Sequence, residues 1–375
     1  MEYTLLKNIA EITMGQSPSS SSYNEEGVGI PFYQGNADFG ELYPTARIWC
    51  NEPKKIANKN DILISVRAPI GALNYATEQC CIGRGLASIT VKDEVLRNYV
   101  FRLLKASRNK LINQGSGSTF KAIGKSNLEE LRIPIVDEMT QKKIMNLMDA
   151  TEQIIRQRQI ELQLFDDLIK ARFVEMFGDP ILNEKEWSCV MITDVCQLIL
   201  GGGTPSKKCE EFFKGKIPWV TPKDMKQSII NDSIDHITED AIVHSTTNLI
   251  PIWSVLMVIR SGILKHALPV AINSIPVTIN QDMKAFIPGE NITAEFLMYF
   301  FKAIEEDVLS KVRGVTADNI DFKTFQKREI IVPPMELQNQ FAAFVTQVDK
   351  SKAVVRKALD ETQLLFDSLM QEYFG

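Results

Sequence analysis

Two long stretches of the chain carry apolar residues at steps of three and four. The first runs from Ile144 to Phe173, and the second runs from Phe341 to Leu369. Steps of this kind over such a length predict amphipathic helices with a narrow apolar seam, which is typical of coiled coils. The first helix is expected to stop at Gly178, because glycine favours the left-handed conformation that ends helices. The expected seam residues are Ile144, Leu147, Ile154, Leu162, Phe165, Phe341, Phe344, Val348, Val355, Leu359, Phe366 and Leu369.

Ahead of each long helix, the pattern changes to short β-branched and aromatic runs separated by Gly, Pro and Asn. The runs at 61–66 and 254–259 are examples, and they predict strands joined by loops. We therefore expect an α+β fold in which two tandem α/β domains alternate with two long helices. The predicted segments are a first domain over 1–136, a first long helix over 137–178, a second domain over 179–333 and a second long helix over 334–375.

The chain contains the same unit twice. Ile30–Tyr33 returns as Ile217–Val220, and Gln141 returns as Gln338. Six such motifs recur in the same order at an offset that rises from 187 to 201 residues, as loop insertions in one copy would produce. Copies related by a two-fold axis would pair their long helices as an antiparallel coiled coil, giving a pseudo-two-fold internal repeat. In the simpler alternative, each helix packs only on its own domain.

Charge and composition exclude several classes of protein. A net charge of −5 excludes a uniformly basic nucleic-acid binder, so any DNA contact must come from local clusters of Lys and Arg. The most apolar run, at 250–259, stops at Arg260 and is too short to cross a bilayer. The N-terminus lacks the pattern of a signal peptide, so we expect a cytoplasmic protein. The six cysteines form no CxxC pair, and no metal site is expected.

Motifs that suggest catalysis are incomplete. The Val-Pro-Pro-Met run at 332–335 lacks the polar first residue and aromatic last residue that an amino-methyltransferase loop needs, so we interpret it as a helix entry. The Gly-Lys-Ser run at 124–126 lacks the upstream glycine of a phosphate-binding loop. The sequence has no Pro-Asp dipeptide, with which the common metal-dependent nuclease motif opens. The chain is therefore expected to be non-catalytic.

The repeated motifs resemble those of one protein family. The Ile-Pro-Phe-Tyr and Ile-Pro-Trp-Val pair, Gln141 and Gln338, and the Leu-Phe-Asp-x-Leu repeats at 164–168 and 365–369 resemble the specificity (S) subunit of type I restriction-modification systems. The resemblance implies two target-recognition domains, each reading one half of a bipartite site on double-stranded DNA. It also implies that the long helices dock two methyltransferase (M) subunits, which methylate adenine at N6, and that restriction (R) subunits complete the nuclease.

The same resemblance implies that this chain holds no cofactor, and that S-adenosylmethionine, ATP and Mg are bound by the partner subunits. Two other functions stay open: a coiled-coil scaffold that binds other proteins, and the specificity partner of a methylase–nuclease fusion. Salt-dependent binding to a two-part DNA sequence would separate a DNA reader from a scaffold. The size and number of co-purifying subunits would separate the two kinds of DNA reader.

DNA binding needs phosphate anchors for affinity and base-edge contacts for sequence. Polar and basic residues gather in Gly- and Ser-rich loops of both domains, where the alternative is an ordinary solvated loop. One repeat position, 197 residues apart, has Arg84 in the first copy and Gln281 in the second, so we expect this pair to distinguish the two half-sites. The candidates are Gln16, Ser17, Ser19, Arg67, Arg84, Lys110, Ser116, Ser118, Thr119 and Lys121 in the first domain, and Thr204, Ser206, Lys207, Lys223, Arg260, Asn280, Gln281, Lys311, Arg313 and Thr316 in the second.

Overall fold

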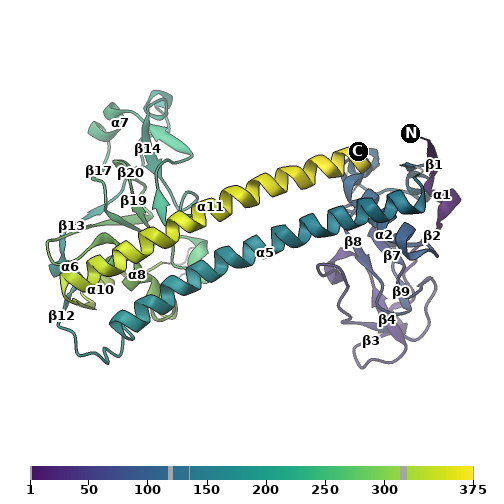
Figure 1. Cartoon of the computed structure of the whole chain (residues 1–375), viewed down its shortest axis with the longest axis horizontal. Helices are drawn as coiled ribbons and strands as arrows, with labels where there is room; N and C mark the ends of the chain where they lie inside the picture. The colour runs from purple at the N-terminus through teal and green to yellow at the C-terminus, as the bar shows by residue number, and fades with distance from the viewer. Residues whose placement is uncertain (1, 117–120, 135, 313–318, 375) are drawn as a thin grey trace. The chain divides into compact units, whose positions relative to one another are not determined.

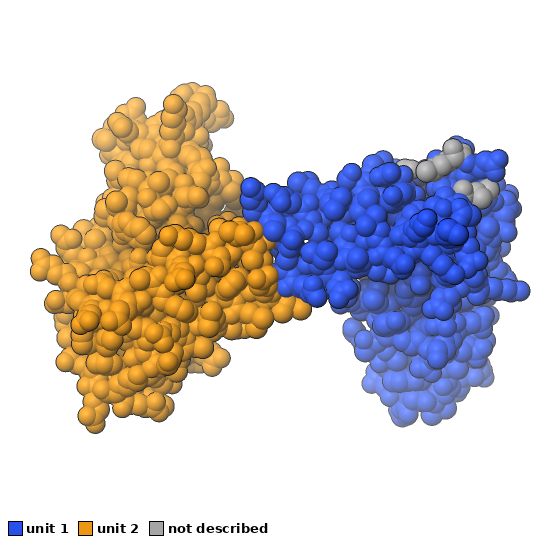
Figure 2. Space-filling model, viewed as in Figure 1, with its two compact units in different colours: residues 1–159, 357–375 blue, residues 160–356 orange. Residues whose placement is uncertain are grey.

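The computed structural model describes residues 2–116, 121–134, 136–312 and 319–374. The chain forms two compact units (Figure 2). Unit 1 comprises residues 1–159 and 357–375, and unit 2 comprises residues 160–356. Two helices of 40 residues, α5 (Glu138–Phe177) and α11 (Met335–Phe374), are each divided between the units (Figure 1). Each unit therefore contains part of both helices and one globular domain.

The domain of unit 1 is built from short, mostly buried strands. The strands are β1 (Tyr3–Leu5), β2 (Glu11–Met14), β3 (Tyr23–Asn24), β4 (Ile30–Tyr33), β5 (Trp49–Cys50), β6 (Ile56–Ala57), β7 (Ile62–Ser65), β8 (Leu73–Tyr75), β9 (Cys80–Ile82), β10 (Leu86–Thr90) and β11 (Arg132–Pro134). One sheet has the order β2-β10-β7-β8, and another has the order β3-β5-β4-β9-β6, in which β4 and β9 are parallel. β1 pairs with β11. The shorter helices are α1 (Leu6–Ile9), α2 (Glu94–Ala106), α3 (Arg108–Gln114) and α4 (Lys125–Glu129), with 3-10 turns at Ser20–Ser22 and Asn36–Asp38.

The domain of unit 2 repeats this plan. Its strands are β12 (Cys189–Met191), β13 (Cys196–Gly201), β14 (Ile217–Val220), β15 (Ile229–Ile230), β16 (Asp235–Ile237), β17 (Leu249–Ile250), β18 (Val255–Val258), β19 (Val270–Asn273), β20 (Val277–Ile279), β21 (Met283–Pro288) and β22 (Glu329–Ile331). The sheets have the orders β13-β21-β18-β19-β15 and β16-β14-β20-β17, with β14 and β20 parallel, and β12 pairs with β22. The shorter helices are α6 (Ile192–Val195), α7 (Glu239–Val243), α8 (Ala294–Ala303), α9 (Glu305–Leu309) and α10 (Phe322–Phe325), with 3-10 turns at Glu210–Phe213 and Gly262–Lys265.

The longest helix within each domain, α2 in unit 1 and α8 in unit 2, begins with the same kind of N-cap. The side chain of Asp93 accepts a hydrogen bond from the amide of Leu96 at the start of α2, and Thr293 does the same for Phe296 at the start of α8. Such N-caps satisfy an amide that would otherwise have no helical partner. Together with the corresponding strand orders β2-β10-β7-β8 and β13-β21-β18-β19, these caps agree with the duplication predicted from the sequence.

The C-terminal end of α11 completes the core of unit 1. Phe366, Leu369 and Phe374 are buried in the same cluster as Met148 of α5 and Tyr99 of α2. The rings of Tyr99 and Phe374 lie 5.0 Å apart. Residues that are far apart in the sequence therefore share one hydrophobic core.

The C-terminal end of α5 is likewise buried in unit 2. Phe173 and Phe177 pack against Phe296 of α8 and Phe341 of α11, and the rings of Phe173 and Phe341 are 5.5 Å apart. α5 follows the first domain along the chain, yet it ends in the core of unit 2. The alternative in which each helix packs only on its own domain is therefore wrong.

Polar contacts join the two long helices inside each unit. In unit 1, the Arg158 guanidinium donates to the carbonyl of Ala358 and to the hydroxyl of Thr362. In unit 2, the ammonium of Lys352 lies 2.6 Å from the carboxylate of Asp166. Within unit 2 the contacts join 166 with 352 and 173 with 341, so the helix segments in this unit run antiparallel.

The seam on α5 differs from the prediction at two positions. Met148 and Ile155 are buried, whereas Leu147 and Ile154 are each 42% exposed, so the assignment of Leu147 and Ile154 to the seam is wrong. Both members of each neighbouring pair are apolar, and one residue along a helix turns a side chain by about 100°, so spacing alone cannot choose between them. Of the other predicted seam residues, Ile144, Phe341, Val348, Phe366 and Leu369 are buried, and Leu162, Phe165, Phe344, Val355 and Leu359 are half-buried.

The ammonium group of Lys302 on α8 is largely shielded from water. Its ammonium donates to the Ser228 hydroxyl over 2.9 Å and lies 4.8 Å from the centre of the Tyr299 ring. Burial lowers the pKa of Lys302 to about 8, and the carboxylates of Asp166 and Asp349 offset only part of that effect.

We expect Lys302→Met to change how stability depends on pH. Between about pH 8 and pH 10.5 the unfolded chain keeps the lysine proton that the folded chain has released, so stability rises with pH through this window. The variant should lose this rise and gain about 1–2 kcal/mol at pH 7. Urea unfolding of both proteins at pH 7 and pH 9.5 measures the difference, and equal slopes with pH would contradict it.

The described residues lack two features that would point to a membrane or a metal. Within those ranges, no helix combines the length and the apolar character that crossing a bilayer requires. In the same part of the chain, no three His, Cys, Asp or Glu side chains gather in a group suited to a metal ion.

Candidate nucleic-acid interface

In each unit, a three-residue turn connects a strand of one sheet to a strand of the other sheet. Turn 1, between β9 and β10, consists of Gly83, Arg84 and Gly85. Turn 2, between β20 and β21, consists of Asn280, Gln281 and Asp282. The turns occupy one repeat position, and the sequence predicts that their middle residues lie near DNA.

The same main-chain hydrogen bonds hold both turns. The amide of the first turn residue donates to the last residue of β4 over 2.8 Å in unit 1, and to the last residue of β14 over 3.0 Å in unit 2. The carbonyl of the third turn residue accepts from Val66 over 2.9 Å and from Ile259 over 2.8 Å, respectively. The amides of Gln16 and Gly203 each donate over 3.0 Å to the residue just before the turn. The duplication therefore extends to individual backbone contacts at this position.

Turn 1 holds Arg84 outward between two buried glycines. The Arg84 amide donates to the hydroxyl of Ser17 over 3.3 Å, and that hydroxyl donates to the side-chain oxygen of Gln34 over 3.1 Å. A Cβ atom on Gly83 would lie 2.5 Å from the Gln34 side-chain oxygen, and one on Gly85 would lie 2.5 Å from the Gln34 carbonyl. The close fit explains why glycines flank the arginine.

Turn 2 holds Gln281 outward in the corresponding place. The hydroxyl of Thr204, the repeat counterpart of Ser17, donates to the side-chain oxygen of Gln281. Asn280 is only 6% exposed, and its side chain is hydrogen-bonded to both the carboxylate and the amide of Asp282. Asn280 therefore shapes the turn and cannot reach a ligand outside it, which corrects its assignment as a DNA contact.

An arginine lies beside each turn: Arg67 follows β7 in unit 1, and Arg260 follows β18 in unit 2. Arg67 forms an isolated bridge with Ala122, and Arg260 forms the equivalent bridge with Asn319. Both arginines are exposed. In unit 2, the Nε and Nη2 atoms of Arg260 lie 2.7 and 2.6 Å from one carboxylate oxygen of Asp282. Turn 1 has Gly85 at that position, so it offers Arg67 no such carboxylate.

The remaining candidates are placed less closely around the turns. Gln16 and Thr204 adjoin them through the contacts above. Lys311 is paired with Asp307 over 2.9 Å, which offsets its charge. Ser19, Lys110, Ser116, Lys121, Ser206, Lys207 and Lys223 are exposed, without a contact to either turn among the hydrogen bonds and ion pairs of the described residues. Ser118, Thr119, Arg313 and Thr316 lie outside the described residues.

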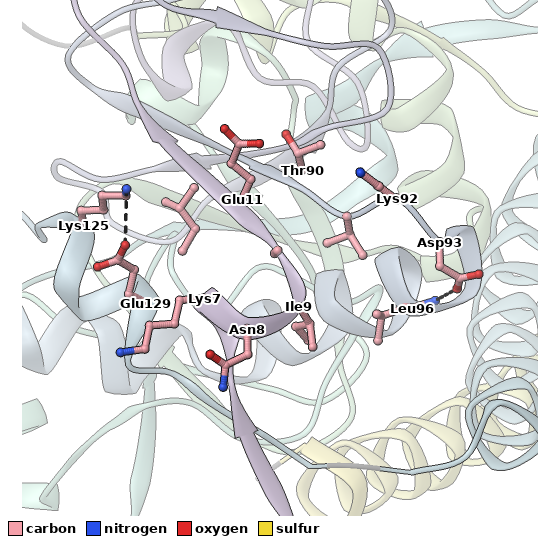
Figure 3. Close-up of a pocket in the computed structure, with 13 residues that line it drawn as sticks. Lys7, Asn8, Ile9, Glu11, Thr90, Lys92, Asp93, Leu96, Lys125 and Glu129 are labelled. Carbon is pink, nitrogen blue, oxygen red and sulfur yellow. Dashed lines mark hydrogen bonds and ion pairs between the residues drawn. The ribbon is translucent and has the colours of Figure 1, made fainter.

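Unit 1 also has a hollow of about 560 Å³ that the sequence did not indicate (Figure 3). Lys7, Lys92 and Lys125 line this hollow, and the Lys125 ammonium is paired with the Glu129 carboxylate over 3.3 Å. Glu11, Asp93 and Glu129 balance the three lysines. None of the predicted DNA contacts lines this hollow, so it is not part of the candidate interface.

Asp282 and Gln34 are the polar residues at the turns that sequence reasoning missed. Asp282 is 22 positions from Arg260 in the sequence, so no local motif joins them. Asp282 does directly follow Asn280 and Gln281, which the sequence predicts as DNA contacts, and this adjacency is the sequence feature that could have indicated it.

Comparison with known proteins gives a consistent result. The family described as type I restriction modification DNA specificity domain matches residues 1–164 and again residues 184–361. The putative type I restriction enzyme MjaX specificity subunit of Methanocaldococcus jannaschii is 47% identical over 146 residues, which are 39% of this chain and 34% of that protein. The Escherichia coli EcoR124I/EcoR124II specificity subunit is 33% identical over 235 residues, covering 60% of this chain and 57% of that protein. These matches span about one third and just over half of the two relatives.

A longer match and two solved structures cover nearly the whole chain. The MjaIX specificity subunit of M. jannaschii is 23% identical over 369 residues, covering 91% of this chain and 84% of that protein. The S subunit structure from M. genitalium has a TM-score of 0.57 at 15% identity, covering 100% of this chain and 96% of that chain. A chain from a structure of type I R-M complex assembly and conformational transition has a TM-score of 0.63 at 16% identity, covering 100% and 97%. The structures support the fold, and the two family matches show that this chain belongs to the type I restriction modification DNA specificity domain family, with the domain present twice.

Proposed function

We propose that the chain is the non-catalytic DNA-specificity subunit of a type I restriction-modification complex, and that each domain reads one half of a bipartite site. One observation carries the proposal. The two units hold the same turn with the same backbone hydrogen bonds, and they present different side chains outward, Arg84 and Gln281. Two domains that share one turn conformation can bind the same kind of ligand. Different exposed side chains on that turn then allow each domain to read a different sequence.

The chemistry of the outward residues fits base recognition. Arginine pairs with the O6 and N7 atoms of guanine, and glutamine pairs with the N6 and N7 atoms of adenine, each through two hydrogen bonds in the major groove. Turn 1 with Arg67 also carries two positive charges and no acid, whereas Asp282 balances Arg260 at turn 2. We therefore propose different base preferences for the two half-sites and a larger phosphate contribution from unit 1.

The long helices suit the role of a spacer. We propose that α5 and α11 form one antiparallel coiled coil, with the two domains related by a pseudo-two-fold axis. The support comes from inside each unit: Arg158 bonds to Thr362 in unit 1, and Lys352 bonds to Asp166 in unit 2. Buried and half-buried positions on α11 from Phe341 to Leu369 also include a series that alternates steps of four and three, as a heptad seam requires.

Partner subunits account for apolar side chains that both helices leave exposed. Exposed apolar side chains that gather into a patch mark contact sites for other proteins. We propose that they dock two methyltransferase subunits carrying S-adenosylmethionine, and that restriction subunits with ATP and Mg join that complex. The exposed apolar residues of the helices include Leu147, Ile154, Ile160, Leu164, Leu168, Val174, Val354, Leu364 and Leu365.

Methylation mapping tests the proposed function. The chain is co-expressed with a candidate methyltransferase subunit from the same organism, the complex is purified, and methylated adenines are mapped in the host genome. We expect one two-part motif with a fixed spacer and a methylated adenine in each half. A continuous single-part motif, or unchanged methylation when the chain is omitted, would contradict the proposal.

Substitutions at the outward turn residues should act on separate halves of the site. Arg84→Ala is expected to weaken discrimination in the first half-site by about 1–3 kcal/mol, and Gln281→Ala is expected to do so in the second. Competition binding with duplexes altered in one half at a time measures both effects, and each variant serves as the control for the other. Equal losses on scrambled DNA would reduce both residues to phosphate contacts.

A further inference from the structure

Asp282 distinguishes the arginines beside the two turns. Arg260 and Arg67 occupy the same repeat position and form the same backbone bridge, but only turn 2 places a carboxylate beside its arginine. The side chain of Arg260 is 48% exposed and that of Asp282 is 24% exposed. An ion pair so open to water contributes little to folding stability. Its presence at turn 2 therefore calls for another explanation.

Among the hydrogen bonds and ion pairs of the described residues, those of Arg260 leave one edge of its guanidinium without a partner. Asp282 accepts from Nε and Nη2 through a single oxygen, so it occupies the side edge of Arg260. The end edge, formed by Nη1 and the second hydrogen on Nη2, has the fork shape that binds two acceptors at once. The other carboxylate oxygen of Asp282 accepts from the Asn280 side chain over 3.0 Å, and the amide of Asp282 donates back to Asn280 over 3.1 Å. The carboxylate is thus anchored on its far side.

We propose that Asp282 is a positioning residue that fixes Arg260 to read one guanine in the second half-site, whereas Arg67 acts as a mobile phosphate anchor in the first. This inference rests on the proposed function. An arginine held in place before binding loses less side-chain freedom on binding, which favours the two-acceptor contact with guanine O6 and N7. Arg67 has no carboxylate from its turn to hold it, and a flexible cation suits phosphate contact.

The test uses the full chain in complex with its methyltransferase partner. The probes are a duplex with the bipartite motif found by methylation mapping, its single-base-pair variants in the second half-site, and a scrambled duplex of equal length. The wild-type complex is measured first. If it does not prefer the motif over the scrambled duplex, the proposed function itself fails, and the variants are not needed to show this.

With that preference established, Asp282→Asn should lower discrimination at one G·C pair of the second half-site by about tenfold. Arg260→Ala should lower discrimination at the same pair, and the double variant should show no further loss, because the two residues act as one unit. Arg67→Ala should instead weaken motif and scrambled DNA alike and reduce the salt dependence of binding by about one phosphate contact. The matched control is Glu211→Gln, which breaks the exposed ion pair with Lys214 in the same unit and should leave discrimination unchanged.

Two results would overturn the inference. If Asp282→Asn strengthens binding to motif and scrambled DNA equally, then Asp282 only repels phosphate. If Asp282→Asn and Arg260→Ala both leave discrimination unchanged, the pair does not face a base. A merely structural role would change stability and leave the identity of the preferred base pair unaffected.

Discussion

Phe173→Ala is expected to destabilise unit 2 by about 3–5 kcal/mol, the usual cost of removing a fully buried phenyl ring. Phe173 is 1% exposed and lies where α5 meets α8 and α11. Its ring is 5.1 Å from Phe177, and 5.5 Å from both Phe296 and Phe341. The loss should shift the unfolding transition of the full chain to lower denaturant, as measured by fluorescence and circular dichroism.

The neighbouring residue provides the control. Val174 is 51% exposed on the same helical turn, so Val174→Ala should change stability by no more than about 0.5 kcal/mol. If both variants unfolded at the wild-type denaturant concentration, the end of α5 would not belong to the core of unit 2.

Gly202→Ala should remove recognition of the second half-site, with a loss of affinity on the order of 100-fold. A Cβ atom on Gly202 would lie 2.1 Å from the carbonyl oxygen of Asn280 and 2.2 Å from that of Ile279. Both atoms are backbone, so turn 2 has to move away from the position that its hydrogen bonds define. Competition binding with duplexes that carry only one half of the motif measures the loss.

A second glycine of unit 2 separates this local effect from a general one. Gly262 has no atom within 4 Å of the position that its Cβ would occupy, so Gly262→Ala should bind as the wild type does. First-half binding by Gly202→Ala should also be kept, which shows that the chain has folded. Wild-type recognition of the second half by Gly202→Ala would place turn 2 outside the interface.

The features that the sequence predicted are those that repeat or are periodic. Steps of three and four located both long helices, and the offset of 197 residues aligned Arg84 with Gln281 from the sequence alone. The same periodicity misplaced Leu147 and Ile154, because each has an apolar neighbour and only packing in unit 1 decides which of the two is buried.

The contacts that the sequence could not predict are those between distant segments. The Arg260–Asp282 ion pair depends on β18 lying beside β21, which no local motif records. Asn280 has the chemistry of a base reader, yet its burial in the turn removes it from that role. Residue type and spacing therefore located the turns, and only the tertiary fold separated the residues that face outward from those that hold the frame.

The pairing of Tyr99 with Phe374 has a consequence for synthesis of the protein. The N-terminal domain emerges from the ribosome long before the segment from Phe366 to Phe374 that fills its core. Until α11 has been translated, the apolar surface around Tyr99 and Met148 lacks the cover that Phe366, Leu369 and Phe374 provide, and surfaces of this kind favour aggregation. Nascent chains stalled before α11 should therefore bind chaperones more strongly than chains that include α11.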